Sequence, residues 1–174
     1  MKNEIRNKMR TLRRTLTSEQ IAQSSQKITQ EILNSDVYTT AKTVCLYLSA
    51  YKEVDTSALL ASCKADEKTV ALPVTDADGV ITLYIDNGEY KTGNFGITEP
   101  ASTETVSPNE IDLFIIPALA YDKQGVRLGF GKGCYDRLLE GTNGYKIGIG
   151  YAFQLVDTLP SDAHDVKMDL VLCE

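Results

Sequence analysis

Apolar residues recur at helical spacing near the start of the chain, so the sequence predicts an opening helix with one apolar face. The residues that form this face are Ile5, Met9, Leu12 and Leu16. Thr17, followed three residues later by Gln20, has the form of a capping box and predicts a second helix over residues 18–34. Asp55 can cap a third helix that reaches about residue 65.

Short apolar or alternating segments with turn residues between them predict six strands. These segments are residues 43–48, 68–74, 80–86, 112–119, 145–151 and 166–172. A short helix over residues 135–140 is expected to end at Gly141, and residues 87–110 contain enough glycine and proline to predict a long loop. Because helices and strands alternate after residue 18, we expect an α/β domain with a mainly parallel sheet. Ligands of such folds bind beyond the carboxyl ends of the strands.

The composition is typical of a soluble globular protein, since 43% of the 174 residues are apolar and 24% are charged. We expect a single domain over residues 1–174. No apolar run approaches the roughly 20 residues that a membrane span needs, and the chain does not begin with an apolar signal segment. The four cysteines form no C-x-x-C pair and have no zinc spacing, so we expect free thiols and a cytoplasmic protein.

The net charge of −6 is unevenly distributed along the chain. The first 14 residues carry six basic side chains against Glu4 alone, which leaves an acidic remainder and argues against nucleic acid as a partner. Lys2, Arg6 and Arg10 lie four residues apart and stack on one helix face, where like charges repel by roughly 0.2–0.5 kcal/mol per pair. This basic face could hold an anion, or it could be solvated or docked on the acidic remainder.

Residues 127–137, which we call the glycine loop, carry the strongest chemical signal. Three glycines alternate with larger residues between a predicted strand and a predicted helix, with Lys132 among them and an arginine at each end. Such a segment offers backbone N–H groups and positive charge to a phosphate. The two common phosphate fingerprints do not fit, because Val126 stands at the first glycine of a P-loop and Cys134 at the last glycine of a dinucleotide loop. The glycine loop is therefore a phosphate loop of another kind or a plain glycine-rich turn.

Two segments, Pro117–Asp122 and Gly125–Arg137, resemble the signature of the 5-formyltetrahydrofolate cyclo-ligases, also called methenyltetrahydrofolate synthetases. The basic opening helix, residues 95–100 and the ending from residue 150 to residue 165 are also similar to that family, in the same order along the chain. One position departs from the family pattern. Two tyrosines usually precede the aspartate of the signature, and here the first is Cys134, a smaller and softer group.

The resemblance implies a three-layer α/β fold related to ribose-5-phosphate isomerase and CoA transferases. It also implies an enzyme that converts 5-formyltetrahydrofolate to 5,10-methenyltetrahydrofolate and releases ADP and phosphate from ATP. In that reaction the formyl oxygen attacks the terminal phosphorus of ATP, and ring closure by the other folate nitrogen then expels phosphate. On this basis we expect ATP, 5-formyltetrahydrofolate and Mg²⁺ as ligands, no nucleic acid or membrane partner, and a monomer.

The resemblance further implies an ATP site made from the opening helix and the glycine loop, in which Lys132 and Arg127 are also catalytic. The residues of this site are Lys2, Arg6, Arg127, Leu128, Gly129, Phe130, Gly131, Lys132, Gly133, Cys134 and Tyr135. Leu48 and Glu53 match the family positions that contact folate. Glu53 could otherwise be an ordinary surface carboxylate.

Asp136 and Asp165 match the family's metal positions, and Mg²⁺ prefers carboxylate and phosphate oxygens. Asp169 is close enough in sequence to compete with Asp165, and Asp136 could instead interact with a helix terminus. Phe95 and Tyr151 are the aromatic candidates for contact with the pterin ring.

Catalysis here needs no protein nucleophile, because phosphoryl transfer depends mainly on alignment and charge neutralisation. No cysteine or serine lies in a nucleophile motif, and His164 has no evident triad partner, so we expect a surface or packed histidine. Two other classes stay open: a small phosphotransferase with an atypical phosphate loop, and a non-catalytic module that binds an anion or a folate.

Overall fold

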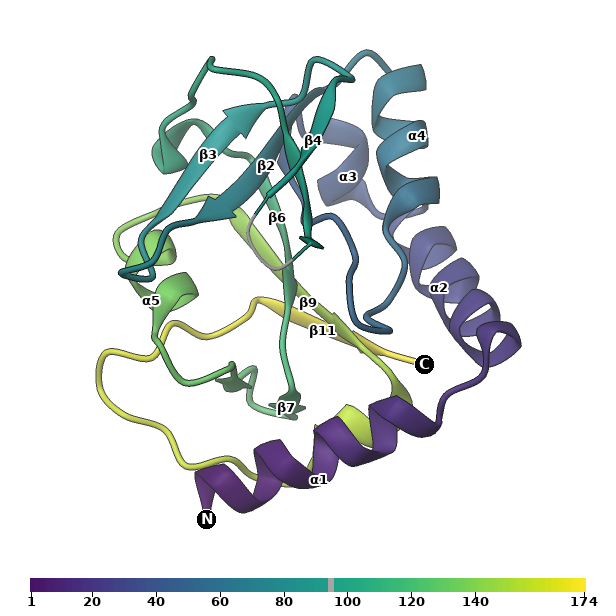
Figure 1. Ribbon diagram of the computed structural model, residues 1–174, viewed down its shortest axis with the longest axis vertical. Coiled ribbons are helices and arrows are strands. Elements are labelled where there is room, and N and C mark those ends of the chain that lie inside the picture. Colours follow the sequence, from purple (N-terminus) through teal and green to yellow (C-terminus); the bar gives the residue numbers. More distant parts are fainter. Residues whose placement is uncertain (94–95) are drawn as a thin grey trace.

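A six-stranded sheet forms the centre of the protein in the computed structural model, which describes residues 1–93 and 96–174 (Figure 1). Its strands are β1 (Thr43–Cys45), β2 (Thr69–Thr75), β3 (Ile81–Ile85), β6 (Leu113–Pro117), β9 (Tyr145–Gly150) and β11 (Leu170–Cys173). The order across the sheet is β11-β9-β6-β1-β2-β3, and only the β2–β3 pair is antiparallel. The predicted mainly parallel sheet is confirmed.

Helices and loops cover both faces of this sheet, which makes the predicted three layers. On one face lie α2 (Ser18–Leu33), α3 (Asp36–Thr40) and α4 (Ser57–Ala65), and their apolar side chains pack on β1, β2, β6 and β9. On the other face α5 (Cys134–Leu139) packs through Leu138 and Leu139 against Phe114 and Ile116 of β6. The four residues Leu113–Ile116 are all buried, as expected for a central parallel strand covered on both sides.

The opening helix α1 (Lys2–Thr15) lies outside these layers, along one end of the molecule (Figure 1). It packs through Met9 on a small three-stranded sheet of β7 (Ala120–Asp122), β8 (Arg127–Leu128) and β10 (Leu155–Val156). The same apolar cluster includes Leu119 and Leu159. Because β8 leads directly into the glycine loop, this packing places α1 beside the loop.

Several predicted elements have different bounds in the structure. The capping box at Thr17 and Gln20 is present, and α2 begins where it was predicted. Helix α4 begins at Ser57, and Asp55 is not its N-cap. The Asp55 side chain nevertheless accepts a hydrogen bond from the Ser57 N–H. The predicted strand 112–119 ends at Pro117, and the chain then enters β7. The predicted loop 87–110 contains a hairpin of β4 (Tyr90–Thr92) and β5 (Thr98–Pro100) and the short 3-10 helix η2 (Pro108–Glu110). A second one, η3 (Ala152–Gln154), follows β9, and none of the described helices is long and apolar enough to span a membrane.

Candidate functional site

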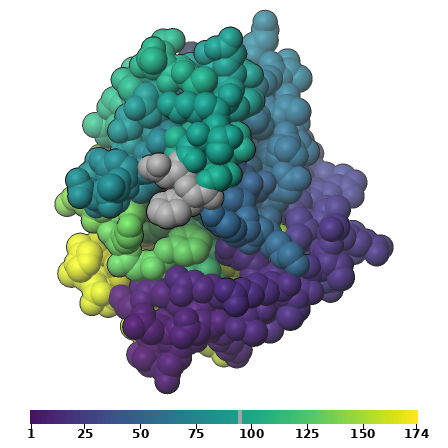
Figure 2. Space-filling view, in the orientation of Figure 1, coloured from purple at the N-terminus to yellow at the C-terminus, as the bar shows by residue number. Residues whose placement is uncertain are grey.

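A cleft of about 1300 Å³ lies between α1, the glycine loop, the 48–53 loop that follows β1, and the end of β2. Figure 2 shows the green residues of the glycine loop between the purple α1 and the teal strands. All of the ATP, folate and metal residues that the sequence predicted line this one cleft. The predicted residues from four separate stretches of sequence are thus brought together at the carboxyl ends of the parallel strands, where ligands of α/β folds bind.

The glycine loop owes its shape to two residues with positive φ. Gly131 has φ +109° and Gly133 has φ +63°, a region that side-chain-bearing residues adopt at a cost. Gly133 is also the N-cap of α5, and no side chain caps the first turn of that helix. Cys134, which follows, lies beside the β2–β3 turn. This residue, smaller than the tyrosine usual in the family pattern, therefore faces the β2–β3 hairpin as well as the cleft.

The basic face of α1 contacts the glycine loop directly. The Nε atom of Arg6 donates to the Gly129 carbonyl at 2.9 Å, and the guanidinium of Arg10 lies 6.0 Å from the centre of the Phe130 ring. Phe130 itself is 54% exposed. The sequence left open whether this face of α1 is solvated, docked on the body or holds an anion, and the structure places it on the rim of the cleft.

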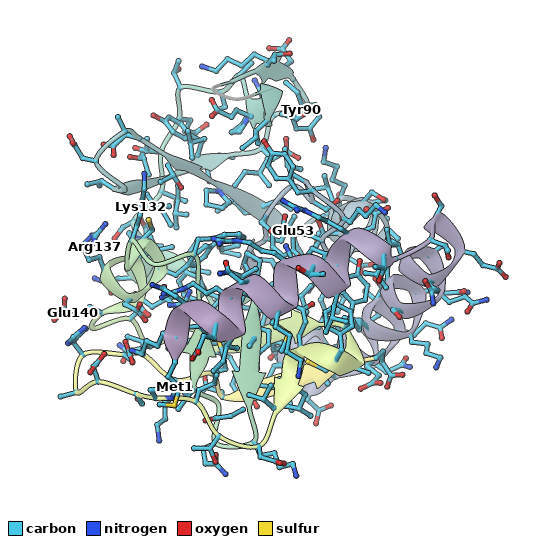
Figure 3. All side chains as sticks on the ribbon, turned by 60° about the horizontal axis from the view of Figure 1, so that its bottom comes forward. Met1, Glu53, Tyr90, Lys132, Arg137 and Glu140 are labelled. Carbon is cyan, nitrogen blue, oxygen red and sulfur yellow. The ribbon has the colours of Figure 1, made fainter. Side chains whose placement is uncertain are left out.

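Lys132 lies at the exposed tip of the glycine loop. Its carbonyl accepts from Arg137, whose other terminal nitrogen donates to the Gly79 carbonyl in the β2–β3 turn at 2.7 Å. Within the described residues the Lys132 ammonium forms no hydrogen bond or ion pair. Figure 3 shows Lys132 and Glu53 on the same side of α1, with Lys132 toward the Met1 end of the helix. The ammonium is therefore available to an anion in the cleft.

Arg127 and Asp136 form a largely buried ion pair in the cleft. The Nη2 atom of Arg127 lies 2.7 Å from Oδ1 of Asp136, and the two side chains are 4% and 21% exposed. The guanidinium also lies 5.3 Å from the centre of the Tyr135 ring, and its Nε is buried without a hydrogen bond among the described residues. The same Asp136 oxygen accepts from the Val166 N–H at 3.3 Å, which ties the segment after Asp165 to the glycine loop.

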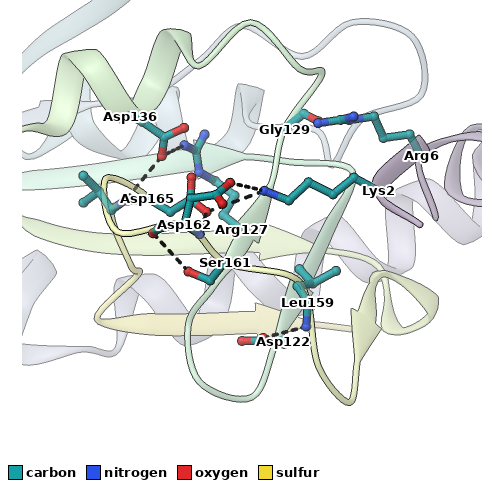
Figure 4. A network of polar contacts seen from close by, with 11 residues as sticks. Lys2, Arg6, Asp122, Arg127, Gly129, Asp136, Leu159, Ser161, Asp162 and Asp165 are labelled. Atoms are coloured by element: carbon teal, nitrogen blue, oxygen red, sulfur yellow. Dashed lines mark hydrogen bonds and ion pairs between the residues drawn. The ribbon is translucent and has the colours of Figure 1, made fainter. Parts of the chain in front are cut away.

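Asp162, His164 and Asp165 form what we call the carboxyl-terminal cluster, whose possible ligand atoms all lie within 4.8 Å of one another. Figure 4 shows Lys2 reaching this cluster from α1: its Nζ lies 2.7 Å from Asp162 and 3.9 Å from Asp165. The hydrogen bond from Lys2 lowers the pKa of Asp162. Asp165 Oδ2 also accepts from the Asp162 N–H at 2.7 Å, which holds the two aspartates together.

The donor set fits a divalent cation that prefers oxygen ligands. Asp136 and Asp165 both line the cleft, and the Val166 contact brings them to the same region. Asp169, which competed with Asp165 in the sequence, instead accepts from the Lys146 N–H of β9 at 2.8 Å and does not line the cleft.

The 48–53 loop presents Leu48 and Glu53 to the cleft. Tyr51 and Lys52 both have positive φ, of 50° and 59°, so the chain turns sharply before Glu53. Glu53 is not a surface carboxylate, because its side chain is only 13% exposed. Burial raises the pKa of Glu53, while a hydrogen bond from the Ala50 N–H and the charge of Arg13 act in the opposite direction.

The two aromatic candidates for a pterin contact fare differently. Tyr151 is buried and stacked on Phe153, its hydroxyl donates to the Lys52 carbonyl at 3.1 Å, and it does not line the cleft. It supports the 48–53 loop from behind, so this candidate for the ring contact does not fit. Phe95 lies outside the described residues.

Comparisons with known proteins show the family to which the chain belongs. A family model described as the 5-formyltetrahydrofolate cyclo-ligase family matches residues 1–174. The chain belongs to this family. It is 36% identical over 176 residues to the 5-formyltetrahydrofolate cyclo-ligase of Haemophilus influenzae, covering 96% of this chain and 94% of that protein. It is 32% identical over 173 residues to the Escherichia coli K12 enzyme of the same name, covering 94% and 95%.

Solved structures of the family have the same fold. The NMR structure of Aquifex aeolicus 5,10-methenyltetrahydrofolate synthetase matches with a TM-score of 0.87 and 36% identity, covering 99% of this chain and 89% of that chain. A 5,10-methenyltetrahydrofolate synthetase from Mycoplasma pneumoniae matches with a TM-score of 0.82 and 31% identity, covering 98% and 97%. These identities over nearly full length make the chain a folate cyclo-ligase family enzyme and not a protein that shares only the fold.

Two residues that line the cleft, Asp162 and His164, and one buried residue beside it, Arg13, were among those not predicted for the site from the sequence. Asp162 and His164 flank Asp165 closely enough that the acidic D-A-H-D segment was a usable signal. Arg13 gave no such signal, because it is one of six basic residues in the opening helix and only its burial sets it apart.

Proposed function

We propose that this protein uses ATP to convert 5-formyltetrahydrofolate to 5,10-methenyltetrahydrofolate, with release of ADP and phosphate. The observation that carries the proposal is the cleft, which is lined both by the glycine loop and by the 48–53 loop with its buried carboxylate Glu53. Its volume of about 1300 Å³ exceeds the roughly 300–1,000 Å³ of pockets that hold one small molecule. Two ligands can therefore meet in it.

The phosphates of ATP bind at the end of the cleft formed by α1 and the glycine loop. Lys132 offers an ammonium that has no partner among the described residues, Arg6 and Lys2 add charge from the helix, and Arg127 adds a buried positive charge at the start of the glycine loop. Charge-assisted contacts of this kind stabilise the charge that develops on a transferring phosphoryl group. Lys132 and Arg127 are the residues to which we assign catalytic roles.

The reaction divides into two balanced steps. The formyl oxygen forms a bond to the terminal phosphorus as the bond from that phosphorus to the ADP oxygen breaks. The second folate nitrogen then bonds to the activated formyl carbon, the carbon–oxygen bond breaks as phosphate leaves, and the proton of that nitrogen ends on the phosphate. Neither step needs a protein nucleophile, so the residues of the cleft act by holding both ligands in line and neutralising charge.

The folate binds at the other end of the cleft, next to the 48–53 loop. An ionised Glu53 can accept hydrogen bonds from N–H groups of the pterin, and the backbone at Leu48 lines the same end. Mg²⁺ held by Asp136 and Asp165 would neutralise phosphate charge when it binds with ATP. We further propose that the enzyme is a monomer and lies in the cytoplasm.

The test is ADP release measured together with the near-ultraviolet absorbance of the methenyl product. We expect equal amounts of both, and only when 5-formyltetrahydrofolate is present. ADP release without the folate would favour a phosphotransferase, and folate binding without ADP release would favour a binding module. Light scattering after size-exclusion chromatography tests the monomer, since a stable dimer would double the mass of 19.1 kDa.

A further inference from the structure

Arg13 is a buried charge whose position the phosphate site does not explain. It lies near the carboxyl-terminal end of α1, roughly 16 Å along the helix from Lys2, with a side chain that is 8% exposed. Its Nη2 donates to the Ala118 carbonyl at 2.8 Å, its Nε has no hydrogen bond among the described residues, and it does not line the cleft. Burying a guanidinium is costly unless a partner compensates its charge.

That partner is Glu53. The Nη1 atom of Arg13 lies 3.8 Å from Oε1 of Glu53, close enough for charge attraction but too long for a hydrogen bond. The other oxygen, Oε2, accepts from the Ala50 N–H at 3.0 Å. A carboxylate has about four acceptor positions, so both oxygens keep capacity for donors that arrive from the cleft.

The loop that carries Glu53 is attached to the same end of α1. Lys52 Nζ donates to the carbonyls of Arg14 and Leu16, at 2.8 Å and 2.7 Å, in the last turn of the helix and just after it. From behind, Tyr151 donates to the Lys52 carbonyl. The carboxylate is therefore fixed in place relative to Arg13.

The other titratable groups around Glu53 are the phenols of four tyrosines, just after β1, on β7, on α5 and after β9. These are Tyr47, Tyr121, Tyr135 and Tyr151. Burial raises the pKa of each phenol, so all four stay neutral between about pH 5 and 9. Among the described residues, Arg13 is thus the cation that opposes the effect of burial on Glu53.

We propose that Arg13 is a positioning residue that keeps Glu53 ionised and oriented toward the folate end of the cleft without touching the substrate. The proposal rests on the proposed function, because it takes Glu53 to be the folate acceptor. It gives Arg13 a task that differs from that of Lys2 and Arg6 on the same helix: those two face phosphate, whereas Arg13 acts on the folate through Glu53.

The test compares four variants with the wild type: Arg13→Met, Arg13→Lys, Glu53→Gln and the double variant Arg13→Met/Glu53→Gln. The matched control is Arg14→Met, on the exposed side of α1. For Arg13→Met we expect the KM for 5-formyltetrahydrofolate to rise roughly tenfold, as loss of a charged contact allows, while the KM for ATP stays unchanged. Removing the positive charge raises the pKa of Glu53 further, so the low-pH limb of kcat/KM for folate should move to higher pH. Arg13→Lys should keep that limb in place with a smaller rise in KM, and Arg14→Met should match the wild type.

The double variant separates this proposal from the proposed function. If Glu53→Gln leaves the folate KM unchanged, the folate site itself is assigned wrongly and the role of Arg13 falls with it. Two other outcomes would leave the folate site in place and overturn only the role of Arg13. In the first, Glu53→Gln raises the folate KM but Arg13→Met does not. In the second, Arg13→Met raises the folate KM by the same factor in the Glu53→Gln background as in the wild type. Should Arg13→Met fail to fold, Arg13→Lys decides, since equal losses for ATP and folate would show a purely structural arginine.

Discussion

Replacing Asp136 with asparagine tests the ion pair under the glycine loop and the metal assignment at once. Asparagine keeps the shape of the side chain and one carbonyl acceptor, but it removes the charge that Arg127 faces at 2.7 Å. Because Arg127 is 4% exposed and its Nε already has no partner among the described residues, the substitution removes the one ion pair that its guanidinium forms within the described part of the chain.

The size of the effect on stability follows from this burial. Hydrogen bonds to charged groups are worth about 1.5–3 kcal/mol, and breaking a fully buried pair costs about 3–5 kcal/mol. Asp136 is 21% exposed, so water screens part of the interaction and the lower range applies. For a chain of 174 residues that range lowers the melting temperature by roughly 3–12 °C, which calorimetry without ligands measures.

The kinetic effect of Asp136→Asn should appear in the Mg²⁺ dependence of the rate. At saturating ATP and folate, loss of one carboxylate ligand moves the half-saturating Mg²⁺ concentration upward. Glu140→Gln is the matched control, because Glu140 also lines the cleft at the end of α5 and neither holds Arg127 nor belongs to the proposed metal site. A lower melting temperature with superposable Mg²⁺ curves would reduce Asp136 to a structural partner of Arg127. An unchanged melting temperature would refute the ion-pair argument itself.

Three further predictions concern single residues. Lys132→Ala should keep the wild-type melting temperature and lower kcat/KM for ATP roughly 10- to 150-fold, from about 1.5–3 kcal/mol, so unchanged kinetics would remove the phosphate role of the loop. Lys2→Met should raise the KM for ATP but not for folate. Because the ion pair of Lys2 with Asp162 is exposed, the free energy of unfolding in urea should change by at most about 1 kcal/mol, and a larger loss would make Lys2 structural. Gly148→Ala should lower the melting temperature by roughly 2–12 °C, because the added Cβ would lie 2.4 Å from the buried Tyr121 ring, and an unaltered melting temperature would contradict that packing.

The parts of the fold that the sequence predicted are those with a strong local signal. The capping box set the start of α2, and the unbroken apolar run at residues 113–116 marked the central strand. The β4–β5 hairpin was missed because all three residues of β4 are exposed and leave no alternation of apolar and polar positions. The short strands β7 and β8 escaped as well, since two or three residues carry no periodicity. The other partner of β7 is β10, which lies much further along the chain.

The candidate site shows the same division. A motif that is contiguous in sequence, such as the glycine loop, could be placed before the structure was known, and so could Glu53 and Asp165 through the family pattern. Burial is a tertiary property, so Tyr151 was assigned to the ring contact from its residue type alone and proved to lie behind the loop. Arg13 was missed for the same reason, because among many basic residues only the folded chain shows which one is buried.

The basic face of α1 illustrates how the folded protein compensates repulsion that is evident in the sequence. Each of its three like charges has its own contact in the free protein: Lys2 with Asp162, Arg6 with the Gly129 carbonyl, and Arg10 with the Phe130 ring. The repulsion alone had suggested that the face needs a bound anion to be stable. These contacts remove that need. A phosphate that binds Lys2 must then compete with Asp162 for its ammonium. A cation that binds the carboxyl-terminal cluster neutralises Asp162 and Asp165 in place of Lys2, and so removes that competition. On the proposed function, ATP and Mg²⁺ should for this reason each strengthen the binding of the other at this end of the cleft, beyond their association in solution.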